Sequence, residues 1–136
     1  MKAKGTLIAD LTRPDGMTLY QRLHRDANKT KWEDMFLVQL KSLGVAPAVQ
    51  QYRFCPDRKF QADFAWPDKK ILVELEGGIW RRGGGAHSHP SNILRDIEKQ
   101  TLAAYHGFRV FRFEENSIKS WSAARMMAEV LNRQPI

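Results

Sequence analysis

Three carboxylates, Asp63, Glu74 and Glu76, fall in two apolar runs of the chain, 60–66 and 70–76. Successive side chains of a strand point to opposite faces, so Glu74 and Glu76 share one face. If the two runs pair as a hairpin, Asp63 faces the same space. Three carboxylates at one sheet edge are costly to ionise together, and a divalent cation removes that cost. The pattern therefore predicts a metal-dependent site.

The chemistry of such a site follows from its oxygen ligands. Mg²⁺ prefers carboxylate and water oxygens, so we expect Asp63 and Glu74 to bind it, with the backbone carbonyl of Leu75 as a third ligand. Asp63 stands between Ala62 and Phe64 in an otherwise apolar run, which argues against a simple turn or edge residue. One or two bound Mg²⁺ (or Mn²⁺) ions can support phosphodiester hydrolysis.

Three further charged residues have a structural and a functional interpretation. Glu76 is a ligand of a second metal, a group that positions water, or a solvated strand end. Glu33 follows Thr30 by three residues, which is the spacing of a helix capping box, or its carboxylate lies at the edge of the metal site. Lys99 places its ammonium near a phosphate, or is a solvated helix charge paired with Asp96.

The glycine-rich stretch 77–90, GGIWRRGGGAHSHP, directly follows the carboxylates. His87 and His89 protonate a leaving group, contact phosphate or bind metal, or are exposed loop residues with no role. Arg81 and Arg82 are candidates for contacts to a nucleic-acid backbone. The glycines match neither a phosphate-loop nor a dinucleotide fingerprint, which argues against a nucleotide cofactor.

The elements that must position these residues are read from hydrophobic periodicity. Helices are expected at 30–43, 91–106 and 117–133, and strands at 49–54, 60–66, 70–76 and 108–113. The expected buried stripes of the three helices are, in order, Trp32, Phe36, Leu40 and Leu43; Ile93, Ile97, Thr101 and Ala104; and Trp121, Ala124, Met127 and Leu131. This order predicts an α/β fold with a four-stranded mixed sheet flanked by helices, plus a C-terminal helix.

Composition limits the class of protein. The 136 residues suit one domain, at 30–136, preceded by a basic N-terminal arm at 1–29. That arm contacts nucleic acid or a second copy of the chain, or is a partly ordered terminus. The net charge of +7 favours a polyanionic partner. The sequence has no long apolar run and no signal peptide, so we expect a cytoplasmic protein without membrane contact.

Asp63 followed by Glu74-Leu75-Glu76 resembles the PD-(D/E)xK nuclease superfamily, whose restriction-endonuclease-like core is αβββαβ. More narrowly, YRFCPDRKFQADFAWPDKKILVELEGGIW and DIEKQTLAAYHGFRVFRFEENSI are similar to the small DUF559-type endonucleases. These are related to very-short-patch-repair endonucleases and occur in bacteria, phages and mobile elements. The resemblance covers roughly residues 30–131.

The resemblance implies a metal site at Asp63 and Glu74, with a supporting helix carboxylate at Glu33. It also implies a catalytic histidine at His87 or His89.

One position departs from the superfamily pattern. The lysine two residues after the metal-binding glutamate is here Glu76. Asp96 and Lys99 match a recurrent DxxK on the following helix. Lys99, a histidine or a second metal therefore takes over the role of the missing lysine.

These observations lead to an expected function with two alternatives. The resemblance implies a Mg²⁺-dependent endodeoxyribonuclease that acts on DNA in repair, recombination or phage DNA processing, in a bacterial or phage-infected cell. One alternative is a Holliday-junction resolvase, which would act as a homodimer because a symmetric two-strand cut needs two sites. The other is a nucleic-acid-binding module without catalysis.

Overall fold

A four-stranded mixed sheet forms the centre of the computed structural model, which describes residues 19–76 and 90–133. Its strands lie in the order β1-β2-β3-β4. They are β1 (Val49–Arg53), β2 (Gln61–Trp66), β3 (Ile71–Glu76) and β4 (Arg109–Glu114). The first three strands pair antiparallel, whereas β3 and β4 pair parallel. A parallel pair needs a long crossover, which here contains a helix.

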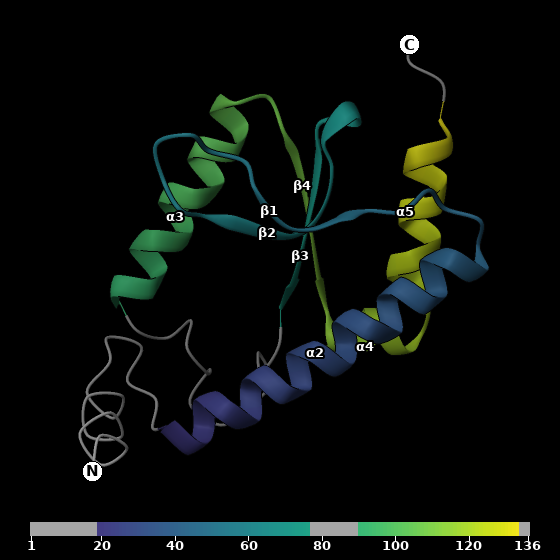
Figure 1. Ribbon diagram of the computed structural model, residues 1–136, viewed down its shortest axis with the longest axis horizontal. Coiled ribbons are helices and arrows are strands. Elements are labelled where there is room, and N and C mark those ends of the chain that lie inside the picture. The colour runs from purple at the N-terminus through teal and green to yellow at the C-terminus, as the bar shows by residue number, and fades with distance from the viewer. Residues whose placement is uncertain (1–18, 77–89, 134–136) are drawn as a thin grey trace.

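Helices cover both faces of this sheet (Figure 1). They are α2 (Leu19–Ser42), α3 (Pro90–Tyr105), α4 (Glu115–Lys119) and α5 (Ser122–Asn132). The helix α3 lies against one face, while α2, α4 and α5 lie against the other. The predicted α/β class, with its mixed four-stranded sheet and C-terminal helix, is confirmed.

The larger core lies between the sheet and the helices α2, α4 and α5. The side chain of Phe36 is fully buried in it, with its ring centroid 5.3 Å from that of Phe64 and 6.2 Å from that of Phe113. The aliphatic side chains of β3 face the same core: Ile71, Val73 and Leu75. The acidic residues between them are thereby directed to the opposite face, as the alternation predicted.

The face under α3 holds a smaller core, and the predicted orientation of this helix is wrong. Ala103 is its buried residue, while Ile93 and Ile97 are 44% and 57% exposed. The predicted stripe members Thr101 and Ala104 are exposed as well. The helix instead turns its charged residues toward the sheet, where charged side chains of β3 and β4 offer partners. With the opposite orientation, the buried carboxylates of β3 would lose these partners, and an unpaired buried charge is strongly destabilising.

The first described helix is longer than predicted. It begins at Leu19, so Thr30 and Glu33 lie inside it and the predicted capping box is wrong. Residues 19–29, expected in the N-terminal arm, form its first part. Neither glycine nor proline interrupts residues 19–43, which allows this length. Gly44, at φ 73°, ends the helix as predicted, because a left-handed residue there suits glycine.

The C-terminal helix is divided in two, which corrects the prediction of one helix at 117–133. Trp121 has a left-handed backbone with φ 69° and redirects the chain between α4 and α5. The buried positions predicted for Ala124, Met127 and Leu131 are confirmed, and Trp121 is half-buried. Across the described ranges, the helices are all too short or too polar to cross a membrane.

The larger core gives a test of the fold. Truncation of the fully buried Phe36 to alanine should lower the free energy of unfolding by about 3–5 kcal/mol, because it leaves a cavity beside Phe64 and Phe113. Urea denaturation followed by circular dichroism measures this. Val38→Ala on the same helix is the control: its side chain is 65% exposed, so a change within about 0.5 kcal/mol is expected. Equal losses in the two variants would contradict this core.

Candidate active site at the end of the sheet

Asp63 and Glu74 face each other across the antiparallel strands β2 and β3. The register pairs Phe64 with Val73, and one further step places Asp63 opposite Glu74. Asp63 is 2% exposed, and its Oδ2 atom accepts a hydrogen bond of 2.8 Å from the backbone N–H of Leu75. The carboxylate therefore accepts a backbone N–H of β3 that would otherwise bond to a neighbouring strand.

The second oxygen of Asp63 binds a lysine from α2. The Nζ atom of Lys29 lies 2.9 Å from Oδ1 of Asp63, and the two side chains are 38% and 3% exposed. A buried charge is stable only when it is paired and hydrogen-bonded, and the pair with Lys29 meets that condition. Lys29 was not among the predicted site residues.

Glu74 is paired with a lysine from the other face of the fold. The ammonium of Lys99, on α3, contacts Oε1 of Glu74, and both side chains are mostly buried. Of the two interpretations of Lys99, a pair with Asp96 is not the contact that forms. The helix instead brings an ammonium directly onto a predicted metal-binding carboxylate.

Arg112, on β4, binds the remaining two acidic groups. Its Nε atom donates a hydrogen bond of 2.7 Å to Oε1 of Glu76, and one terminal nitrogen lies 3.0 Å from Oδ2 of Asp96. The Glu76 side chain is only 16% exposed. It is therefore not a solvated strand end. The guanidinium joins β3 to α3 beside Glu74, which the parallel register places next to Arg112.

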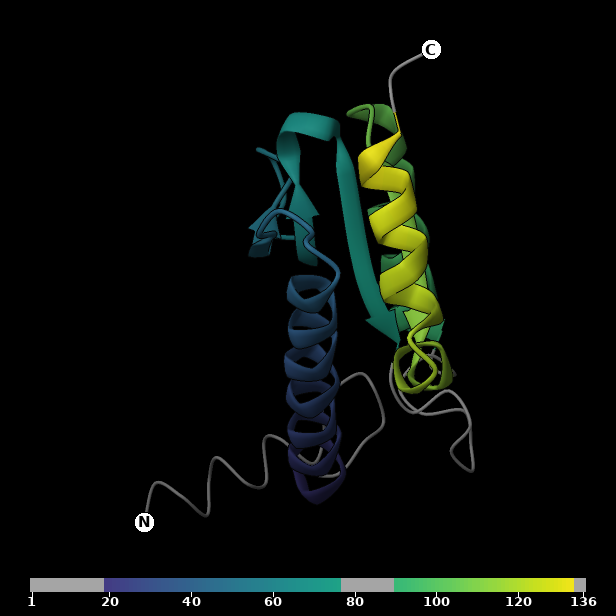
Figure 2. The same ribbon diagram turned by 90° about the vertical axis from the view of Figure 1, so that its right-hand side faces the viewer.

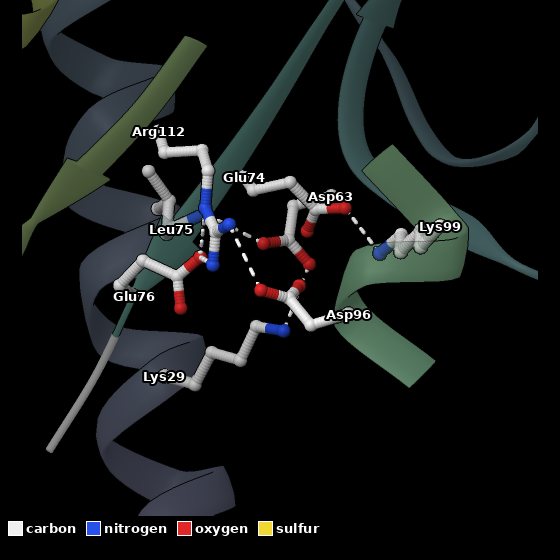
Figure 3. A network of polar contacts seen from close by, with 8 residues as sticks. All are labelled: Lys29, Asp63, Glu74, Leu75, Glu76, Asp96, Lys99 and Arg112. Atoms are coloured by element: carbon white, nitrogen blue, oxygen red, sulfur yellow. Dashed lines mark hydrogen bonds and ion pairs between the residues drawn. The ribbon is translucent and has the colours of Figure 1, made fainter. Parts of the chain in front are cut away.

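Seven charged side chains thus converge at one end of the sheet (Figure 3). They come from five elements, α2, β2, β3, α3 and β4. Four carboxylates face three cationic groups: Asp63, Glu74, Glu76 and Asp96 with Lys29, Lys99 and Arg112. The charges nearly cancel, so each of the four carboxylates has a cationic partner within the chain.

Burial shifts the protonation of several of these groups. It raises the pKa of the Glu74 carboxyl to about 7; Lys99 opposes this rise and Asp63 adds to it. Burial and the charge of Asp63 also raise the pKa of Glu33. For Lys29, burial lowers the pKa, but Asp63, followed by Glu33 and Glu74, raises it more. Glu33 is therefore close enough to Asp63 for the two charges to interact; its predicted place at the edge of a metal site stays a prediction.

The donors suit a hard divalent cation in kind. Asp63 and Glu74 offer carboxylate oxygens on neighbouring strands, and Mg²⁺ commonly completes its shell with water and carbonyl oxygens such as that of Leu75. Within residues 19–76 and 90–133, no group of three His, Cys, Asp or Glu side chains is placed to hold a metal. A cation here would use the two carboxylates and displace the lysines that now contact them.

Four predicted residues, Arg81, Arg82, His87 and His89, lie outside the described residues. Two unpredicted ones, Lys29 and Arg112, are part of the cluster. Arg112 had no local signal, because its place beside Glu74 follows from the parallel register of β3 with β4. Lys29 precedes Glu33 by four residues. Because α2 begins at Leu19, the two side chains lie on the same face of this helix.

Comparisons with known proteins give a partial likeness. No protein-family model matches the chain, and no solved structure matches it significantly. The chain is 32% identical over 98 residues to an S-adenosylmethionine synthase of Prochlorococcus marinus strain AS9601, covering 67% of this chain and 24% of that protein. For the protein of the same name in strain NATL1A, the identity is 33% over 81 residues, with coverages of 54% and 20%. The chain spans about a fifth to a quarter of the length of these relatives, so the likeness does not carry their named activity over.

The raised pKa of Glu74 predicts how stability depends on pH. The folded value of about 7 lies above the ordinary 4.5, so the folded state holds this proton more tightly. The contribution of Glu74 to stability is therefore greatest below pH 4.5 and is lost as the pH rises to about 7. The free energy of unfolding of Glu74→Gln, relative to that of the wild type, should therefore rise by up to about 3 kcal/mol between pH 4.5 and about 7. Urea denaturation in EDTA measures it.

Glu129→Gln provides the matched control for this measurement. Its side chain is 67% exposed and pairs with Arg133 on the surface of α5. The difference between this variant and the wild type should stay nearly constant with pH. If the difference in the free energy of unfolding between Glu74→Gln and the wild type also stayed constant with pH, the raised pKa of Glu74 would be contradicted.

Proposed function

We propose that this protein is a Mg²⁺-dependent endodeoxyribonuclease of the PD-(D/E)xK type. The contact between Lys99 and Glu74 carries the proposal. The sequence has Glu76 where the superfamily pattern has its lysine, and the ammonium of Lys99 reaches the same metal-binding carboxylate from α3. The αβββαβ order of the fold supports the same assignment.

Asp63 and Glu74 would hold the metal in this proposal, with the backbone carbonyl of Leu75 as a third ligand. Bound Mg²⁺ would acidify a water molecule and neutralise the charge of the phosphate. The ammonium of Lys99, released from Glu74 by the metal, would stabilise negative charge on the phosphate. Arg112 pairs with Glu76 and Asp96 beside these groups. Its positive charge would reduce the repulsion between their carboxylates and the phosphate of the substrate.

Cationic residues near the site support DNA as the substrate. Lys31 and Lys119 lie 5.4 Å and 5.1 Å from the ring centroid of Trp32, which is half-buried. Trp32 follows Lys29 by three residues and so lies on the same side of α2. Lysines around an aromatic ring suit contacts to a phosphate backbone, and the net charge of +7 favours the same partner.

The decisive experiment measures cleavage of duplex, nicked, mismatched and branched DNA in Mg²⁺ or Mn²⁺. Glu74→Gln and Lys99→Met should each lower the cleavage rate by about 100-fold or more, because they remove a metal ligand and a charge-stabilising group. Glu129→Gln and Lys41→Met, both at exposed positions on helices, are the matched controls and should cleave like the wild type. No cleavage by the wild type, or undiminished cleavage by Asp63→Ala, would refute the proposal.

The ion pairs of the site favour a second candidate, a nucleic-acid-binding module without catalysis. Asp63 and Glu74 each already contact a lysine, so the cluster is balanced by the chain itself. Calorimetry with Mn²⁺ separates the two candidates. A nuclease should show a binding site that Glu74→Ala abolishes, whereas a pure binding module should show DNA binding and no such site.

A dimeric junction resolvase would use the same chemistry with two copies of the chain. Preference for branched DNA in the cleavage panel, together with a dimer in sedimentation with junction DNA, would support this narrower activity. A monomer that prefers linear duplex would refute it.

A further inference from the structure

The ion pair between Lys29 and Asp63 has a role that the proposed nuclease chemistry leaves open. Both oxygens of the Asp63 carboxylate are engaged: Oδ2 accepts the N–H of Leu75, and Oδ1 lies 2.9 Å from the ammonium of Lys29. The oxygen that faces Lys29 is the one that a metal ion would have to share or take over. Lys29 and a divalent cation therefore compete for the same atom.

The two members of this pair differ in their freedom to move. The Asp63 side chain is 3% exposed and is fixed by the sheet, whereas that of Lys29 is 38% exposed. Lys29 comes from the N-terminal half of α2, which projects past the end of the sheet (Figure 2). A lysine has a flexible four-carbon stem, so its ammonium can leave Asp63 without any change in the helix.

We propose that the ammonium of Lys29 occupies the metal's position at Asp63, that metal binding displaces it, and that it then binds a phosphate of the DNA backbone. The inference rests on the proposed function, since it assumes the metal site at Asp63 and Glu74. Its physical basis is that a buried, charged carboxylate left without a partner is strongly destabilising. Lys29 is that partner before the metal arrives.

Two consequences follow for binding. Metal binding without DNA is weakened, because the ion must first break the Lys29 pair. DNA favours metal binding, because its phosphates accept the displaced ammonium, and by linkage the metal favours DNA binding equally. Lys29 is thus a positioning residue that couples the two ligands.

Mn²⁺ binding in the absence of DNA tests the inference directly. Free Mn²⁺ is measured by electron paramagnetic resonance as the ion is titrated into wild type, Lys29→Met and Lys41→Met. Lys29→Met should bind Mn²⁺ about tenfold more tightly, since it removes the competitor. Lys41→Met removes an equal charge from an exposed position on the same helix and should stay within about threefold of the wild type. Lys29→Gln, which keeps hydrogen-bond donors, repeats the test if Lys29→Met does not fold.

The coupling is measured by fluorescence anisotropy of a labelled duplex, with Ca²⁺ in place of Mn²⁺ to slow cleavage. Ca²⁺ should tighten DNA binding in the wild type and in Lys41→Met, and should do so markedly less in Lys29→Met. Mn²⁺ affinity in Lys29→Met equal to or below that of Lys41→Met would overturn the inference and leave the nuclease proposal intact. The absence, in every variant, of a Mn²⁺ site that Glu74→Gln abolishes would overturn both.

Discussion

A carboxylate buried in a sheet needs hydrogen-bond donors and a cation around it, and the end of this sheet supplies both to Asp63. Its two oxygens are satisfied by the backbone of β3 and by Lys29 of α2. The helix α2 is therefore tied to the end of the sheet by charge as well as by the packing of Phe36. Loss of the cation would leave an unpaired buried charge, which costs far more than an ordinary surface ion pair contributes.

The same requirement explains the orientation of α3. Glu74 and Glu76 face α3, and this helix directs Lys99 and Asp96 toward the sheet. Its aliphatic residues Ile93 and Ile97 are therefore exposed. Arg112 closes the arrangement by binding Glu76 and Asp96 together. The result is a cluster whose charges nearly cancel, so a divalent cation bound there, as we propose, would replace cations of the protein. Such an exchange would link metal binding to the anion that receives the released lysines, and a phosphodiester backbone is suited to that role.

Much of the fold was predictable because it follows from local patterns. The alternation in β3 assigned its aliphatic and acidic side chains to opposite faces, and Gly44 ended its helix because a left-handed residue was needed there. The start of α2 was not predictable from the capping signal, since Thr30 and Glu33 also fit a helix interior. The break at Trp121 was missed because a left-handed tryptophan has no sequence signature; tertiary packing imposes it.

Within the candidate site, the sequence by itself determined that Asp63, Glu74 and Glu76 lie at one end of the sheet, because the period of two and the hairpin are local properties of the chain. It also marked Lys99 as a possible substitute for the missing lysine. Only the tertiary structure decided which cation meets which carboxylate: Lys29 with Asp63, Lys99 with Glu74, and Arg112 with Glu76. These partners lie on separate elements, and their pairing depends on the packing of helices against both faces of the sheet. Short-range patterns carry no information about that packing.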